Sequence, residues 1–190
     1  MKNLITTIFS LMLTMTITAQ DLFSKYESMD EVTSGVINSK MFSMIASMDI
    51  EIDDPEAKAY MEMVNKIENV KLLVTGNEEI SKKMVADVEN YIRKAKLDEL
   101  MRFKDGAENV RFYVREGKDE NHVRELMMLI TGLSEMLDGE DLSINGKNRP
   151  VETVIVSILG DIDLKQISKI TSKMNLPGGE HLDKAGKKKL

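Results

Sequence analysis

The sequence predicts an α+β domain in which a mainly antiparallel sheet has helices packed on one face. In the first half of the chain, apolar residues recur mostly at the three- and four-residue spacing of amphipathic helices. In the second half, they alternate with polar residues or form short continuous runs, which is typical of strands. Helices early and strands late favour this class, and residues 20–174 have the length of a single domain.

Residues 1–19 are expected to form a cleavable secretory signal peptide. Lys2 supplies the positive charge, residues 4–17 contain no charged side chain, and Ala19 offers a small residue at the cleavage position. The apolar run is short for a membrane span, with an uncleaved N-terminal anchor as the alternative. We therefore expect an exported protein, periplasmic or extracellular, without an integral membrane segment after cleavage.

Four helices are expected in the first half of the chain. Asn38 or Ser39 caps the second helix, and Asp54 caps the third, where Pro55 occupies the first helical position. Asn77 and two acidic residues begin the fourth, as the helix dipole favours. The apolar positions that define the four helices are Leu22, Phe23 and Tyr26; Met41, Met44, Ile45 and Met48; Ala57, Tyr60, Met61, Val64 and Ile67; and Ile80, Met84, Val88, Ile92 and Ala95.

Strands are expected at residues 32–37, 70–74, 101–103, 110–114, 123–130 and 154–159. Gly35 interrupts the first and predicts an edge or bulged strand. Residues 110–114 alternate strictly, and residues 123–130 are almost continuously apolar, which predicts a central position. The last run is expected to end at Gly160.

The last third of the chain also contains an excursion and a tail. Residues 135–150 are polar and rich in Gly and Asn, which predicts an exposed loop or hairpin. Asp163 and Gln166 match a capping box before a final helix. Residues 175–190 are expected to form a flexible, Lys-rich tail. The core-facing residues of the final helix would be Leu164, Ile167, Thr171 and Met174.

Composition excludes several functional classes. The chain has no cysteine, so it has no disulfide, no thiolate metal site and no cysteine nucleophile. Its net charge of −6 argues against a protein that binds the nucleic-acid backbone. The absence of tryptophan and an aromatic content of 5% argue against a stacking platform for bases or sugars.

Three stretches together resemble a known family. They are residues 70–74 (Val-Lys-Leu-Leu-Val), residues 110–114 (Val-Arg-Phe-Tyr-Val) with 123–130, and residues 159–167, which contain Gly160-Asp161-Ile162-Asp163-Leu164. In this order behind a signal peptide, they resemble the domain of unknown function 4252 family, small exported proteins of Bacteroidota. The resemblance covers residues 22–174. It implies one compact domain, an envelope location and a link to envelope signalling, and it assigns no catalytic residue.

Two acidic clusters are interpreted as solvated turns. An EF-hand loop that began at Asp49 would need Gly at its sixth position and Glu at its twelfth, which hold Asp54 and Tyr60. The acidic run at residues 49–56 is therefore read as a loop and helix cap. Asp138, Glu140 and Asp141 are read as a polar turn rather than a weak calcium site.

Methionine, histidine and lysine offer further candidates. The thioethers of Met41, Met44 and Met48 suit Cu(I), but Ile45 shares their face, which favours a buried stripe. His122 follows Asp119 and Glu120, yet no catalytic motif accompanies this carboxylate–histidine pair, so a surface histidine is favoured. The remaining candidates, His181, Lys184 and Lys187 to Lys189, fall in the expected tail.

No residue is predicted to be catalytic, cofactor-binding or metal-ligating, and no cofactor is expected. The favoured hypothesis is a non-catalytic interaction or regulatory module of the cell envelope, with an envelope protein as partner and the oligomeric state left open. One alternative is a small-molecule-binding domain with a cavity between sheet and helices. The other is a carboxylate-dependent hydrolase with a pocket around His122 and the loop after Gly132.

Overall fold

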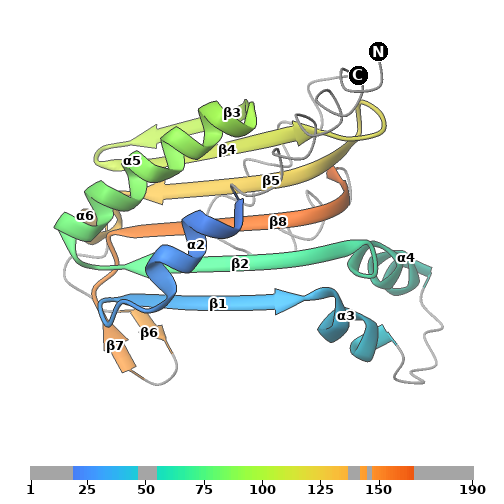
Figure 1. The fold of residues 1–190 in the computed structure, drawn as a ribbon, viewed down its shortest axis with the longest axis horizontal. Helices are drawn as coiled ribbons and strands as arrows, with labels where there is room; N and C mark the ends of the chain where they lie inside the picture. The colour runs from blue at the N-terminus through green and yellow to red at the C-terminus, as the bar shows by residue number, and fades with distance from the viewer. Residues whose placement is uncertain (1–18, 47–54, 137–141, 145–146, 165–190) are drawn as a thin grey trace, which may run out of the picture.

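The computed structural model describes residues 19–46, 55–136, 142–144 and 147–164. Its main feature is a six-stranded antiparallel sheet with the strand order β1-β2-β8-β5-β4-β3, accompanied by the two-stranded ribbon β6-β7. Helices α2 and α5 lie across one face of this sheet (Figure 1). The elements are α2 (Ala19–Glu27), β1 (Val32–Asn38), α3 (Ser39–Ala46), α4 (Pro55–Val64), β2 (Ile67–Thr75), α5 (Glu78–Ala95), β3 (Asp98–Asp105), β4 (Glu108–Glu116), β5 (His122–Thr131), α6 (Leu133–Met136), β6 (Leu142–Ile144), β7 (Lys147–Arg149) and β8 (Thr153–Asp163).

Strand β8 joins two parts of the sheet that are separate in sequence. On one side it pairs with β2, which in turn pairs with β1. On the other side it pairs with β5, the last strand of the β3-β4-β5 meander. Strand β5 therefore has a neighbour on each side, which confirms the central position predicted for residues 123–130.

Helix α5 supplies most of the cover on one face of the sheet. The Asn77 side-chain oxygen accepts hydrogen bonds from the Glu79 and Ile80 N–H groups at 3.0 and 3.1 Å, as predicted for the cap. Below the helix, Ser81 and Thr153 share a buried hydroxyl hydrogen bond of 2.7 Å. The side chains that fill the interface between helices and sheet include Phe23, Tyr26, Leu73, Met84, Val88, Tyr113, Met127, Leu129 and Ile155.

The opposite face of the sheet is also apolar. Met63 and Val64 from the end of α4 belong to the buried cluster on this face. Because both faces carry buried apolar side chains, the central strands have nearly continuous hydrophobic runs instead of a strict alternation. The sheet residues of this second cluster include Val74, Val110, Phe112, Val114, Leu126, Ile130 and Ile162.

The strand register shifts at one end of the sheet in three adjacent strand pairs. The shifts fall beside Glu68 in the β2–β8 pair, beside Arg124 in the β5–β8 pair, and between Arg115 and Glu116 in the β4–β5 pair. At the centre of this region, Gly160 has a φ of +149°, and a Cβ on it would lie 2.3 Å from the Lys66 carbonyl oxygen. Glycine is therefore required where the chain of β2 crosses close to β8.

The structure confirms the predicted α+β class and corrects three details. Gly160 does not end the last strand, because it forms a bulge through which β8 continues to Asp163. Ile67 does not extend the third helix, because α4 ends at Val64 and Ile67 pairs with Gly160 in the sheet. Met41 and Met44 are not buried, since 50% and 55% of their surfaces are exposed. The excursion predicted at residues 135–150 does contain a hairpin, formed by β6 and β7.

Several predicted segments lie outside the described residues. They are the signal peptide up to residue 18, the final helix beyond Leu164 and the Lys-rich tail at residues 175–190. Ala19, the last residue of the predicted signal peptide, is the first residue of α2.

We predict that Gly160→Ala destabilises the protein by at least about 2 kcal/mol, because an added Cβ collides with main-chain atoms at a positive φ. The matched control is Gly35→Ala, whose Cβ would meet only the Leu72 side chain at 3.8 Å. The control should stay within about 1 kcal/mol of wild type. Urea unfolding measures both free energies, and equal losses would contradict this role of Gly160.

Candidate functional site

A hollow of about 490 Å³, lined mainly by charged residues, lies at the end of the sheet where the register shifts. Its walls come from β2, β8, β5, the end of β4 and the β4–β5 connection, so that residues distant in sequence meet there. The residues that define the hollow are Glu68, Arg115, Lys118, Arg124, Gly160 and Asp161.

The charged groups around this hollow fall into two classes. Lys118 Nζ lies 2.6 Å from Asp161 Oδ2, so these two charges neutralise one another. Glu68 and Arg124 are exposed, and neither forms an ion pair with another residue in the described part of the chain. The hollow therefore retains one uncompensated carboxylate on β2 and one uncompensated guanidinium on β5.

Arg115 connects the hollow to a buried carboxylate. Its Nη2 donates to Glu125 Oε2 at 2.7 Å, while only 1% of the Glu125 side chain is exposed. The Tyr91 hydroxyl donates toward both Glu125 oxygens at 2.8 and 2.9 Å. These contacts couple the end of α5 to β4 and β5, and they hold the Arg115 guanidinium at the wall of the hollow.

Burial dominates the electrostatics of this cluster. It raises the pKa of Glu125, against the opposing effects of the Tyr91 hydrogen bond and the Arg115 charge. It also raises the pKa of Tyr91, and the Glu125 charge adds to that effect. The arrangement serves a structural purpose, because every partner of Glu125 stabilises the carboxylate where it lies.

The structure does not bring together the residues of the hydrolase hypothesis. His122 begins β5, whereas Gly132 follows the end of that strand, roughly 30 Å away at the rise of an extended chain. The His122 ring instead lies 2.7 Å from Asp119 in the exposed turn before β5. The acid with a raised pKa near this end is Glu125, and its oxygens are already engaged by Tyr91 and Arg115.

Most of the other candidates lie outside the described residues. They are the acidic run at residues 49–54, Met48, the cluster of Asp138, Glu140 and Asp141, and the tail residues. Within the part that the structure describes, no group of three or more acidic or histidine side chains is placed to hold a metal ion. In the same part of the chain, no helix is both long and apolar enough to cross a bilayer.

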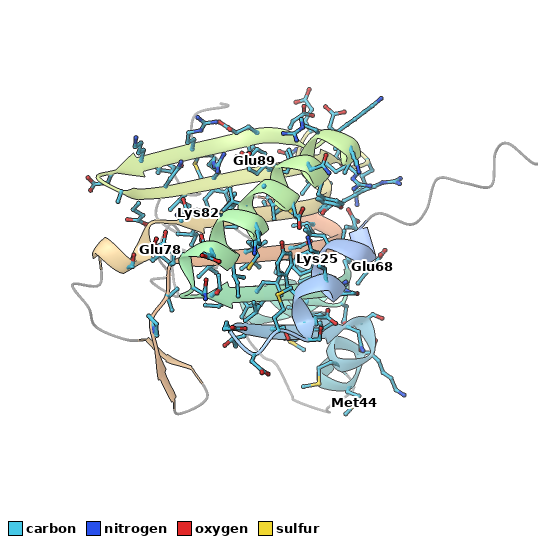
Figure 2. All side chains as sticks on the ribbon, turned by 60° about the vertical axis from the view of Figure 1, so that its left-hand side comes forward. Lys25, Met44, Glu68, Glu78, Lys82 and Glu89 are labelled. Carbon is cyan, nitrogen blue, oxygen red and sulfur yellow. The ribbon has the colours of Figure 1, made fainter. Side chains whose placement is uncertain are left out.

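A second candidate surface, which the sequence interpretation missed, combines the open edge of β1 with α3. Its large apolar side chains are Val36, Ile37, Met41 and Met44, with exposed fractions between 44% and 55%. Figure 2 shows Met44 on α3 at the periphery of the molecule. The pattern that marks this surface in the sequence is a strand without charge or proline, followed by apolar residues on a helix.

The β1 edge also presents main-chain groups. Thr75 directs its carbonyl oxygen to the Glu152 N–H, toward β8, so the alternate residues of β2 bond to β1. Through the β1–β2 register, Thr33, Gly35 and Ile37 are bonded to β2. The N–H and C=O groups of Ser34 and Val36 must then point away from β2, toward the open edge.

The two edges of the sheet differ in chemistry. Strand β3, at the far edge, carries Asp98, Glu99, Arg102, Lys104 and Asp105, which is the usual protection against pairing with another chain. Strand β1 carries no charged residue. An additional strand would therefore meet little resistance at β1 and a fixed charge pattern at β3.

We predict that the stability of wild type relative to Glu125→Gln falls as the pH rises above about 4, the range in which an ordinary glutamate begins to ionise. The pKa of Glu125 is raised in the folded state, so the folded protein binds more protons than the unfolded chain in this range. Urea unfolding at several pH values tests this. Glu120→Gln, which removes the same charge from an exposed turn, is the control. If the stability of wild type relative to Glu125→Gln rose with pH instead, the stabilisation of the Glu125 carboxylate by Arg115 and Tyr91 would outweigh the effect of its burial.

Comparison with known proteins identifies the family but no individual relative. The family model described as Domain of unknown function (DUF4252) matches residues 26–170. No curated protein matches the chain, and no solved structure does. Because the family match spans more than half of the sequence and agrees with the resemblance seen in its strands, the chain belongs to the DUF4252 family.

Proposed function

We propose that the protein is a non-catalytic interaction module of the cell envelope, which docks a partner protein along the β1 edge and α3. The observation that carries this proposal is the open, uncharged edge of β1 with four exposed apolar side chains beside it. Exposed apolar side chains next to unpaired main-chain groups are typical of protein interaction sites.

The chemistry of this surface favours an extended segment of the partner. Main-chain hydrogen bonds to Ser34 and Val36 would add a strand to the sheet, and they depend little on the partner's sequence. Specificity would come from side chains, because Val36 and Ile37 lie on opposite faces of the sheet. The exposed Met41 and Met44 extend the apolar contact, and flexible thioether side chains adapt to different partners.

A location in the envelope is supported by the sequence. Residues 1–19 have the charge and apolar pattern of a signal peptide, and export would place the domain in the periplasm or outside the cell. The absence of cysteine means that the domain depends on its packed core for stability in that environment.

The described residues support binding better than catalysis. His122 is paired with Asp119 on a turn, and Glu125 is enclosed by Tyr91 and Arg115. The space between the helices and the sheet is filled by fully buried side chains such as Met84, Met127 and Leu129, which disfavours a ligand cavity there.

We expect a photoreactive amino acid at Val36 or Met44 to crosslink the same partner in envelope fractions of the native host. The control position is Lys82 on α5, whose side chain is 79% exposed and lies on another surface (Figure 2). Crosslinks from Val36 and Met44, but not from Lys82, would support docking at this surface. Equal capture from all three positions, or none from the first two, would contradict it.

A substitution pair tests the strand-addition geometry. Val36→Pro removes an N–H that points away from β2, so the β1–β2 hydrogen bonds remain while an added strand is blocked. Val36→Thr keeps that N–H and a branched side chain. We predict that Val36→Pro weakens partner binding at least tenfold and that Val36→Thr does so much less. Circular dichroism verifies that both variants are folded, and equal affinities would exclude strand addition.

A further inference from the structure

The hollow at the shifted end of the sheet differs from an ordinary surface depression in how it is built. Three adjacent strand pairs lose register at the same level, which turns Glu68 and Arg124 out of the regular alternation. Between them lies Gly160, where the close approach of Lys66 excludes any side chain. The main chains of β2 and β8 therefore lie in close contact at Gly160, which forms part of the wall of the hollow.

The two free charges of the hollow come from strands with a defined separation. Glu68 belongs to β2 and Arg124 to β5, with β8 between them, so their main chains are two strand spacings apart, or about 10 Å. Both side chains line the hollow, and neither forms an ion pair within the described residues. Their separation leaves room for a ligand that reaches from one charge to the other.

The positive charge of the hollow is carried by Arg124. Arg115, next to Arg124, is held in place by the buried Glu125 and by Tyr91. Arg115 is paired with Glu125 and Lys118 with Asp161, so neither adds much net charge. The β4–β5 side is thus positive, and the β2 side, at Glu68, is negative.

From this geometry we infer that the hollow binds short peptides with free termini, with the carboxylate at Arg124 and the ammonium group at Glu68. An extended tripeptide places its terminal charges roughly 9 Å apart, which is comparable with the spacing of about 10 Å between the main chains of β2 and β5. This site is separate from the β1 edge, and it does not depend on the function proposed for that edge.

Calorimetric titration with trialanine, N-acetyl-trialanine and trialanine amide tests this inference. The free tripeptide should bind, and capping either end should weaken binding about tenfold, because each cap removes one ion pair. Glu68→Gln should abolish the penalty of acetylation only, and Arg124→Gln should abolish the penalty of amidation only. Glu79→Gln and Arg93→Gln, at exposed positions on α5, are the matched controls and should keep both penalties.

If Glu68→Gln abolishes only the loss of affinity caused by acetylation, and Arg124→Gln only the loss caused by amidation, both the ligand class and its orientation are established. Failure of trialanine to bind, or binding that is indifferent to capping and to both substitutions, would overturn the inference. Glu68 and Arg124 are exposed, so their substitution leaves the core intact, and thermal unfolding verifies this.

Discussion

The pairing of β8 between β2 and β5 is the interaction on which the rest of the structure depends. It joins β1 and β2 to the β3-β4-β5 meander, and these pairings connect residues far apart in sequence. The same strand supports the helical layer, because Thr153 bonds to Ser81 of α5. Such non-local pairings form late and at a high entropic cost, so we expect β8 to complete the fold rather than begin it.

The position of β8 also decides what the molecule exposes. With β8 in the centre, β1 and β3 become the edges, and only β3 is protected by charges. The hollow beside Gly160 lies at the end of the sheet where β1 leads into α3, since Asn38 pairs with Asn69. The two proposed binding surfaces thus lie toward the same end of the sheet but differ in chemistry: one offers apolar side chains and main-chain groups, the other opposite charges.

Local patterns in the sequence predict the elements better than the sites. The cap at Asn77 and the stripe through Met84 and Val88 predict α5, and apolar runs predict β5 and β8. The pairing of β8 with β2 cannot be predicted in this way, because no local pattern encodes a non-local register. For the same reason, the sequence alone suggests that Gly160 ends a strand, whereas in the structure it lies at a bulge inside β8. The spacing of Met41 and Met44 predicts an amphipathic helix, but spacing alone does not show whether that face meets the core.

Amide hydrogen exchange of the free protein, followed by NMR, tests the account most directly. We predict strong protection throughout residues 154–159, because both neighbours of β8 are paired. In β1 we predict alternation: Thr33, Gly35 and Ile37 are protected through β2, while Ser34 and Val36 exchange rapidly at the open edge. Protection of Ser34 and Val36 equal to that of Gly35 would show that the edge is already covered, and it would contradict the proposed docking surface.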